Sequence, residues 1–194
     1  MTADRSAEPP VRRLASRIVY RNDWMSVRED DIVFADGSTS IYGVVDKPDY
    51  ALIIAEEPGP DGSRFHLVEQ YRYSIERRSL EFPMGGWPAG KTGSAAELGQ
   101  AELREETGLT AESWVHLGKL VQSTGHSSQC FDIYLASVLT AGAHDRETTE
   151  GDMVHRTVTE DEFCDLIADG TVTDSPTVAA YGMLLMHRRT VGRA

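Results

Sequence analysis

Three carboxylates occupy the last turns of a predicted helix, on the face where a packed helix carries apolar residues. The segment AAELGQAELREETGL ends with Glu102, Glu105 and Glu106. At about 100° per residue, Glu102 continues the stripe begun by Ala95 and Leu98, and the other two glutamates flank it. Clustered carboxylates repel one another and lose hydration, so they need a compensating positive charge.

A divalent cation is the compensating charge that this pattern favours. No lysine or arginine shares the stripe, because Arg104 falls on the opposite face with Glu97 and Gln100. Carboxylate oxygens are the ligands that hard divalent cations prefer. The alternative is a solvated acidic helix end, and the E-x-x-E-E spacing alone does not separate the two.

Length and charge limit the class of protein. The chain has 194 residues, a formal net charge of −12 and two cysteines without CxxC spacing. This size predicts one domain, and the negative charge argues against nucleic-acid or membrane partners. Bound divalent cations would still allow an anionic substrate. We expect a cytoplasmic protein, because no apolar run is long enough for a membrane span and the cysteines fit a reducing compartment.

The elements that must hold the carboxylates alternate between strands and helices. The main helix should start after Ser94, which forms a capping box with Glu97, and should end at Gly108. A second helix should be capped by Thr159 with Glu162, and a third by Ser175. Alternating strand patterns lie at residues 16–21, 25–34, 39–46, 50–57, 64–73, 116–123, 131–139 and 152–160. Strands interspersed with three helices predict a mixed α/β sandwich.

The acidic helix and its preceding loop resemble the signature of the Nudix hydrolases. That signature runs G, five residues, E, seven residues, then R-E-U-x-E-E-x-G-U, where U is a bulky aliphatic residue. Its last part is matched by Glu102, Leu103, Glu105, Glu106, Gly108 and Leu109. Two departures are plain. Ala101 stands where the signature has arginine, and the loop after Gly85 is two residues longer, which leaves the first glutamate without a clear counterpart.

The resemblance extends to the ADP-ribose pyrophosphatase branch of that family. The segment QYR at residues 70–72 and the residues Glu81, Pro83 and Gly85 match its Q-Y-R strand end and E-L-P-A-G loop. The similarity covers about residues 15 to 190. It implies an α/β/α sandwich with a mixed sheet and an amino-terminal antiparallel extension. It divides the chain into a flexible tail (1–14), amino-terminal strands (15–48) as a candidate dimerisation element, and a Nudix domain (49–190).

The resemblance also implies roles for particular residues. Glu102, Glu105 and Glu106, together with the carbonyl of Met84, would hold Mg²⁺, or alternatively Mn²⁺, and Glu105 would act in catalysis. Arg72 would contact a substrate phosphate, unless it forms a plain surface salt bridge. Glu81 would help bind substrate, either as an anchor behind the ligands or as a further ligand.

The resemblance defines the general base and the substrate less closely than it defines the metal ligands. The base would come from the loop DRETTEGD, where Glu147, Glu150 and Asp152 are available and Glu150 is favoured. Trp24 is the candidate for contacting the nucleobase, with Tyr20 and Tyr42 as further aromatics, while Trp87 and Lys91 lie in the long loop. Thr124 stands where ADP-ribose enzymes tend to have proline, so a nucleotide sugar other than ADP-ribose stays open. A homodimer is expected.

Three functions remain open at this point. The first is magnesium-dependent hydrolysis of a nucleoside diphosphate linked to a group X, with ADP-ribose or a nucleotide sugar favoured. The second changes the substrate to a dinucleoside polyphosphate, a coenzyme or a nucleoside triphosphate. The third is a non-catalytic module that senses a nucleotide, which Ala101 keeps open.

Overall fold

The chain folds as two compact units. The computed structural model describes residues 8–60, 62–88, 90–143 and 151–192. Unit 1 comprises the chain up to Pro48 together with Val121–Gln129, and unit 2 comprises Asp49–Leu120 and the chain from Cys130 onward. Each unit is described by itself below.

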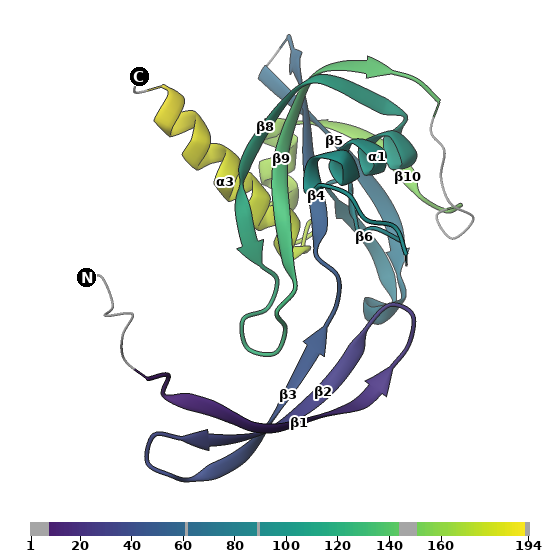
Figure 1. Cartoon of the computed structure of the whole chain (residues 1–194). Helices are drawn as coiled ribbons and strands as arrows, with labels where there is room; N and C mark the ends of the chain where they lie inside the picture. Colours follow the sequence, from purple (N-terminus) through teal and green to yellow (C-terminus); the bar gives the residue numbers. More distant parts are fainter. Residues whose placement is uncertain (1–7, 61, 89, 144–150, 193–194) are drawn as a thin grey trace. The chain divides into compact units, whose positions relative to one another are not determined.

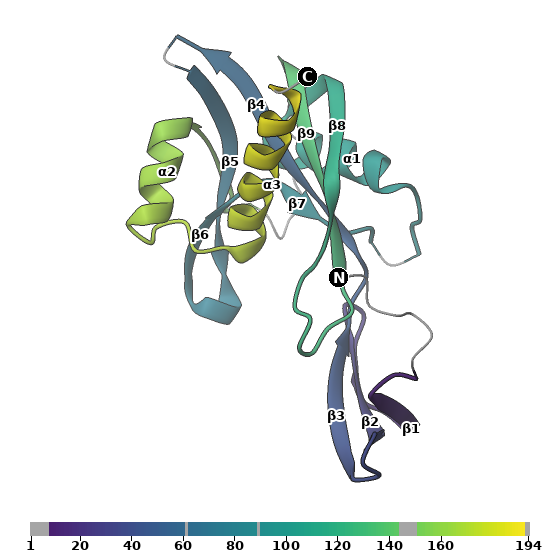
Figure 2. The ribbon, with the colours of Figure 1, turned by 90° about the vertical axis from the view of Figure 1, so that its left-hand side faces the viewer.

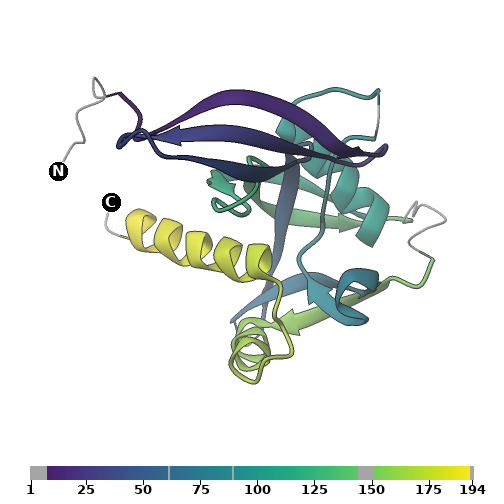
Figure 3. The same cartoon turned by 90° about the horizontal axis from the view of Figure 1, so that it is seen from below.

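Unit 1 is built on an antiparallel sheet of three strands in the order β1-β2-β3 (Figure 3). The strands are β1 (Val11–Arg21), β2 (Ser26–Phe34) and β3 (Thr39–Asp46). In the turn between the first two, the Asn22 side chain accepts the N–H groups of Trp24 and Met25, as asparagine commonly does in turns. The strand begins at Val11, so the boundary predicted at residue 15 was four residues too late.

Unit 2 is built on a mixed sheet with the strand order β10-β5-β4-β9-β8 (Figure 1). These strands are β4 (Tyr50–Gly59), β5 (Gly62–Arg72), β8 (Leu109–Val121), β9 (Cys130–Ala141) and β10 (Val154–Thr159). The central pair β4 and β9 runs parallel, whereas β5 runs antiparallel to both β4 and β10. The expectation of an α/β fold with a mixed sheet is therefore confirmed.

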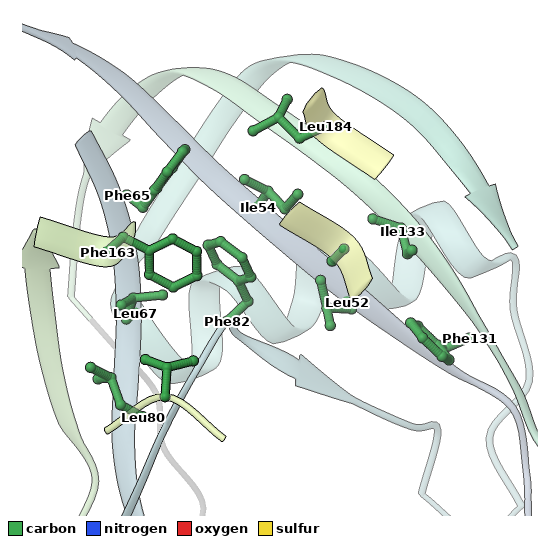
Figure 4. Packing of buried hydrophobic residues seen from close by; sticks show 12 residues of the cluster. Leu52, Ile54, Phe65, Leu67, Leu80, Phe82, Phe131, Ile133, Phe163 and Leu184 are labelled. Carbon is green, nitrogen blue, oxygen red and sulfur yellow. The ribbon is translucent and has the colours of Figure 1, made fainter. Parts of the chain in front are cut away.

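Strand β4 has an apolar layer on each of its two faces. Leu52 and Ile54 point into a large cluster with Phe65, Phe82, Phe163 and Leu184 (Figure 4). The alternate residues Ile53 and Ala55 pack with Leu103 in a second cluster. A strand covered on both faces reads as a continuous apolar run, which is how YALIIA appears in the sequence.

Three helices cover these two faces. Helix α1 (Ala95–Thr107) supplies Leu103 to the smaller cluster. Helices α2 (Glu160–Ala168) and α3 (Ser175–Val191) supply Phe163 and Leu184 to the larger one, and Figure 2 shows α2 beside β5. The result is the predicted α/β/α sandwich.

The helix ends follow the predicted capping signals with one exception. Ser94 with Glu97 and Thr159 with Glu162 both form complete capping boxes, and Gly108 ends α1 with a φ of 77°. The predicted cap Ser175 was wrong, because the N-cap of α3 is Asp174, whose side chain accepts the N–H of Thr177. Ser175 is instead the first helical residue.

The sheet opens between β4 and β5, and the opening is filled by two short strands that the sequence did not predict. These are β6 (Arg77–Glu81), which follows a short 3₁₀ turn (Tyr73–Ile75), and β7 (Met84–Gly85). Strand β4 pairs with β5 through Ala55–Gly59 but with β7 through Ala51 and Leu52. The far half of β5 pairs with β6. The chain from residue 77 to 85 therefore crosses from β5 to β4.

Within the described residues, no helix is long and apolar enough to cross a membrane.

A buried histidine in β5 gives the fold a predictable pH dependence. His66 is buried, its Nδ1 lies 2.9 Å from Nε2 of His155, and its Nε2 lies 3.6 Å from Glu57. Burial is the main effect and lowers the pKa of His66, while Glu57 opposes it. The unfolded chain therefore binds this proton at a higher pH than the folded chain.

We expect the urea midpoint to fall as the pH is lowered from about 7.5 to about 5.5, because protonation then favours the unfolded chain. His66→Phe keeps a buried ring and removes the titrating group, so its midpoint should fall less over the same interval. An equal fall in both proteins would contradict the role given to His66.

Candidate active site

The segment Glu81–Gly85 is held by four different elements of unit 2. Glu81 bonds to Arg72 at the end of β5, and the N–H of Phe82 donates to Oγ1 of Thr177 in α3 at 3.1 Å. The carbonyl of Pro83 accepts the N–H of Ile53 in β4 at 2.9 Å. The N–H of Met84 donates to Oε2 of Glu106 in α1 at 3.1 Å.

Two of the predicted metal ligands lie directly against this segment. Glu106 is 2% exposed and bonds the backbone of Met84. The carboxylate of Glu102 lies beside Gly85, where a Cβ would come within 2.6 Å of all three carboxylate atoms. Because Gly85 has no side chain, the Glu102 carboxylate fits beside it. A Cβ at this position would displace that carboxylate. Glu105 is partly buried on the adjoining face of α1.

Arg72 contacts a buried carboxylate. Its Nε lies 2.9 Å from Oε1 of Glu81, and its Nη2 contacts the other carboxylate oxygen. Glu81 is 3% exposed, whereas the side chain of Arg72 is 38% exposed. A paired guanidinium of this kind is more than a surface salt bridge, and it still reaches solvent, where an anion can meet it.

The carboxylates around Arg72 outnumber the cations. The hydrogen bond to Glu81 is the largest cause that raises the pKa of Arg72, and the charges of Glu106 and Asp174 raise it further. Burial raises the pKa of Asp174, and the nearby charge of Glu81 adds to this effect. One guanidinium therefore faces three carboxylates, which indicates a centre suited to additional positive charge.

The donor set fits a hard divalent cation, although the carboxylates do not converge as a finished site. Within residues 8–60, 62–88, 90–143 and 151–192, no group of three or more His, Cys, Asp or Glu side chains is arranged to hold a metal ion. The donors are nevertheless all oxygen atoms, and Gly85 leaves room for Glu102 beside the Met84 backbone. These are the chemical features that Mg²⁺ or Mn²⁺ requires.

Glu97 and the long loop after Gly85 have a clear structural setting. Glu97 is exposed, and its carboxylate accepts bonds from Ser94 at the helix cap, so it lies away from Glu102 as its position on the helix predicted. In the long loop, Nε1 of Trp87 donates to the carbonyl of Gly93, and Nζ of Lys91 lies 5.9 Å from the Trp87 ring. These two contacts within the loop stabilise its conformation.

The candidate bases fall into two groups. Glu147 and Glu150 lie outside the described residues. Asp152 is described, and its Oδ2 accepts a bond from Arg78 at 2.9 Å and one from the N–H of Tyr71 at 3.2 Å. These two bonds tie the Asp152 carboxylate to β5 and β6, so its geometry favours an anchoring role.

Trp24 belongs to unit 1, whereas the glutamates and Arg72 belong to unit 2. Its side chain is 74% exposed and lines an open cavity of about 270 Å³ with Arg21, Asn22 and Lys47. Asp23 and Asp46 line the same cavity, so its charges balance, and the exposed indole can stack on a planar ligand.

Comparison with known proteins shows what this chain is similar to. Residues 11–45 match the model of the nucleoside diphosphate sugar hydrolase N-terminal domain. ADP-ribose pyrophosphatase of Mycobacterium tuberculosis is 28% identical over 190 residues, which cover 97% of this chain and 88% of that protein. The corresponding enzyme of Bacillus subtilis is 25% identical over 174 residues, covering 89% and 91%. These similarities support the resemblance to the Nudix hydrolases.

The relatives support a Nudix pyrophosphohydrolase that most resembles the ADP-ribose pyrophosphatase branch. The methanol dehydrogenase activator of Bacillus methanolicus is also similar, with 28% identity over 149 residues, 77% of this chain and 72% of that protein. The crystal structure of ADP compounds hydrolase superposes with a TM-score of 0.80 at 21% identity and covers 97% of this chain and all of that one. This likeness confirms the Nudix fold.

Sequence reasoning missed three residues of this candidate centre. Asp174 and Thr177 lie at the start of α3, nearly 100 residues beyond the loop that they adjoin. The cap at Asp174 was detectable, because D-S-P is a strong helix start, but nothing in the sequence ties it to Phe82. Tyr50 was also missed: burial raises its pKa first, and Asp174 and Glu81 raise it further, which shows that it lies near both.

Gly85→Ala should lower turnover roughly tenfold or more while leaving the fold intact, because the new Cβ displaces only the carboxylate of Glu102. Gly85 has no positive φ, so alanine fits its backbone. Gly86→Ala is the matched control, since its Cβ would meet its nearest neighbour at an ordinary 3.6 Å. Steady-state hydrolysis by the three proteins tests this, and equal losses in both variants would count against the role of Gly85.

Proposed function

We propose that this enzyme hydrolyses the pyrophosphate bond of a nucleoside diphosphate linked to a group X, with Mg²⁺ as the required cation and ADP-ribose or another nucleotide sugar as the substrate. The products are a nucleoside monophosphate and a phosphorylated X. The observation that carries the proposal is the placement of Glu102 and Glu106 against the backbone of Met84 and Gly85.

Each residue then has a chemical task. Glu102, Glu105 and Glu106, with the carbonyl of Met84, would hold the cation, which when bound neutralises phosphoryl oxygens and lowers the pKa of a water molecule. Arg72 binds a phosphate oxygen through its exposed guanidinium, while Glu81 fixes its orientation. Placement and charge neutralisation are the main requirements for attack on a pyrophosphate.

The substrate assignment is supported by the names of the relatives. Two similar proteins are ADP-ribose pyrophosphatases, and the amino-terminal match is to a nucleoside diphosphate sugar hydrolase domain. Thr124, in place of the usual proline, counts against ADP-ribose specifically and keeps another nucleotide sugar in the proposal. Trp24 would stack on the base in its cavity beside Arg21 and Lys47.

A homodimer formed through unit 1 is part of the proposal. Strands β1 to β3 expose many large apolar side chains, and a patch of this kind on a small sheet commonly marks a protein interface. The exposed apolar residues include Leu14, Ile18, Val19, Tyr20, Trp24 and Ile41. Cys130 and Cys164 are free thiols, which supports the proposed cytoplasmic location.

A substrate panel tests the reaction. ADP-ribose, other nucleotide sugars, diadenosine polyphosphates and nucleoside triphosphates are each incubated with and without Mg²⁺, and a coupled phosphatase then detects new phosphate monoesters. We expect magnesium-dependent cleavage of ADP-ribose or a nucleotide sugar to a nucleoside monophosphate. A preference for dinucleoside polyphosphates or triphosphates would overturn the substrate, and binding without turnover would overturn the proposal as a whole.

Glu106→Gln tests the assignment of the cation ligands. Glutamine keeps an oxygen that can accept the Met84 N–H and removes the negative charge, so the fold should persist. Turnover at saturating Mg²⁺ should fall by about 100-fold or more. Glu112→Gln is the control, since Glu112 is exposed on β8. Turnover equal to that of the control would refute the assignment.

Substitution of the three loop carboxylates tests the general base. Glu150→Gln should lower kcat by roughly 10²- to 10⁴-fold with little change in KM, the usual effect of losing a base. Asp152→Asn should lower kcat less, because its carboxylate is held by Arg78 and the Tyr71 backbone. Glu147→Gln is the neighbouring control. A larger loss for Asp152→Asn than for Glu150→Gln would reverse the assignment.

A further inference from the structure

We propose that Thr177 is a positioning residue of the active centre, and that its hydroxyl holds the backbone which presents the Met84 carbonyl. The inference rests on the proposed function. Thr177 is fully buried in the first turn of α3, yet its Oγ1 is aimed out of the helix and accepts the N–H of Phe82 at 3.1 Å.

The N–H of Phe82 lacks the usual partner that a strand provides. Phe82 lies between the end of β6 at Glu81 and the start of β7 at Met84, so the sheet ladder is interrupted at this residue. Phe82 is itself fully buried, and a buried N–H without a partner is costly. The threonine hydroxyl therefore supplies an acceptor where the sheet supplies none.

The helical backbone that carries the hydroxyl is fixed. The N–H of Thr177 donates to Oδ2 of Asp174 at 2.9 Å, which fixes the first turn of α3. Threonine is branched at Cβ, so its side chain has few rotamers in a helix. The bond to Phe82 thus joins two rigid elements rather than a flexible side chain to a loop.

The effect on the site follows from the chain between Phe82 and Met84. The Glu81 side chain is fixed by Arg72, and the Met84 N–H is fixed by Glu106. Phe82 lies between these two anchors, so its peptide orientation sets how the following carbonyls face the glutamates of α1. Removal of the Thr177 hydroxyl frees this peptide while leaving every proposed ligand in the chain.

Three variants separate positioning from general stability. Thr177→Val has nearly the same shape and lacks the hydroxyl, whereas Thr177→Ser restores the hydroxyl. Thr190→Val is the matched control, because the Thr190 hydroxyl lies in the same helix and bonds only its own backbone at Met186 among the contacts described. Thr177→Ala replaces the valine variant if that variant does not fold, as judged by its thermal transition.

Two measurements are made on each protein. Hydrogen exchange of the Phe82, Met84 and Gly85 amides, measured without added metal, reports on the hydrogen bond between Phe82 and Thr177. Calorimetric titration with Mn²⁺ and the Mg²⁺ concentration for half-maximal activity report the site. In Thr177→Val we expect exchange at Phe82 to rise by roughly tenfold or more, and Mn²⁺ affinity and Mg²⁺ activation to weaken by about tenfold. Thr177→Ser and Thr190→Val should stay close to the wild type.

The outcomes distinguish this inference from the proposed function. Faster exchange with unchanged Mn²⁺ affinity and Mg²⁺ activation would overturn it, because the bond would then be structural alone. Unchanged exchange would also overturn it. A wild-type protein that neither binds Mn²⁺ nor turns over any substrate would overturn the proposed function, and this inference with it, whereas failure confined to the Thr177 variants leaves the proposed function standing.

Discussion

The structure of unit 2 depends on how the segment Glu81–Gly85 is held. This segment crosses the opening between β5 and β4, where an uninterrupted sheet ladder cannot satisfy its backbone. Its polar groups are bonded instead by Arg72, Thr177, Ile53 and Glu106, which come from four elements. Buried backbone groups need such partners, so the sheet, α1 and α3 must assemble together before this segment is stable.

The same arrangement concentrates negative charge. Glu106 serves the fold by bonding the Met84 backbone, and Glu81 does so by bonding Arg72. Both carboxylates are nearly buried, and Asp174 adds a third charge beside the same guanidinium. A fold that used only these contacts would retain an excess of buried charge, which is costly. Cation binding by the neighbouring glutamates would relieve that excess, so structure and proposed chemistry share the same residues.

The position of one small residue is equally constrained. Gly85 allows the carboxylate of Glu102 to lie against the backbone, whereas at Gly99 of α1 an added Cβ would meet Ile53, Trp114 and Tyr134 only at ordinary contact distances. The acidic end of helix α1 packs against β7, and its apolar side packs against β4. Close approach of a helix to a sheet fixes the carboxylates more firmly than a loop would. For this reason the glutamates of α1 are held in place although Ala101 stands where the signature has arginine.

The sequence by itself determined the local structure and the resemblance to a family. Capping boxes at Ser94 and Thr159 and the glycine at 108 mark helix ends through contacts within a few residues, and the alternating strands report which side faces a core. The resemblance of the acidic helix led directly to the Nudix hydrolases. Only the tertiary structure decided the rest. The pairing of β7 with β4 and the bond from Phe82 to Thr177 join residues that are distant in sequence. Such contacts have no local signal, because they exist only once the sheet and α3 have packed together.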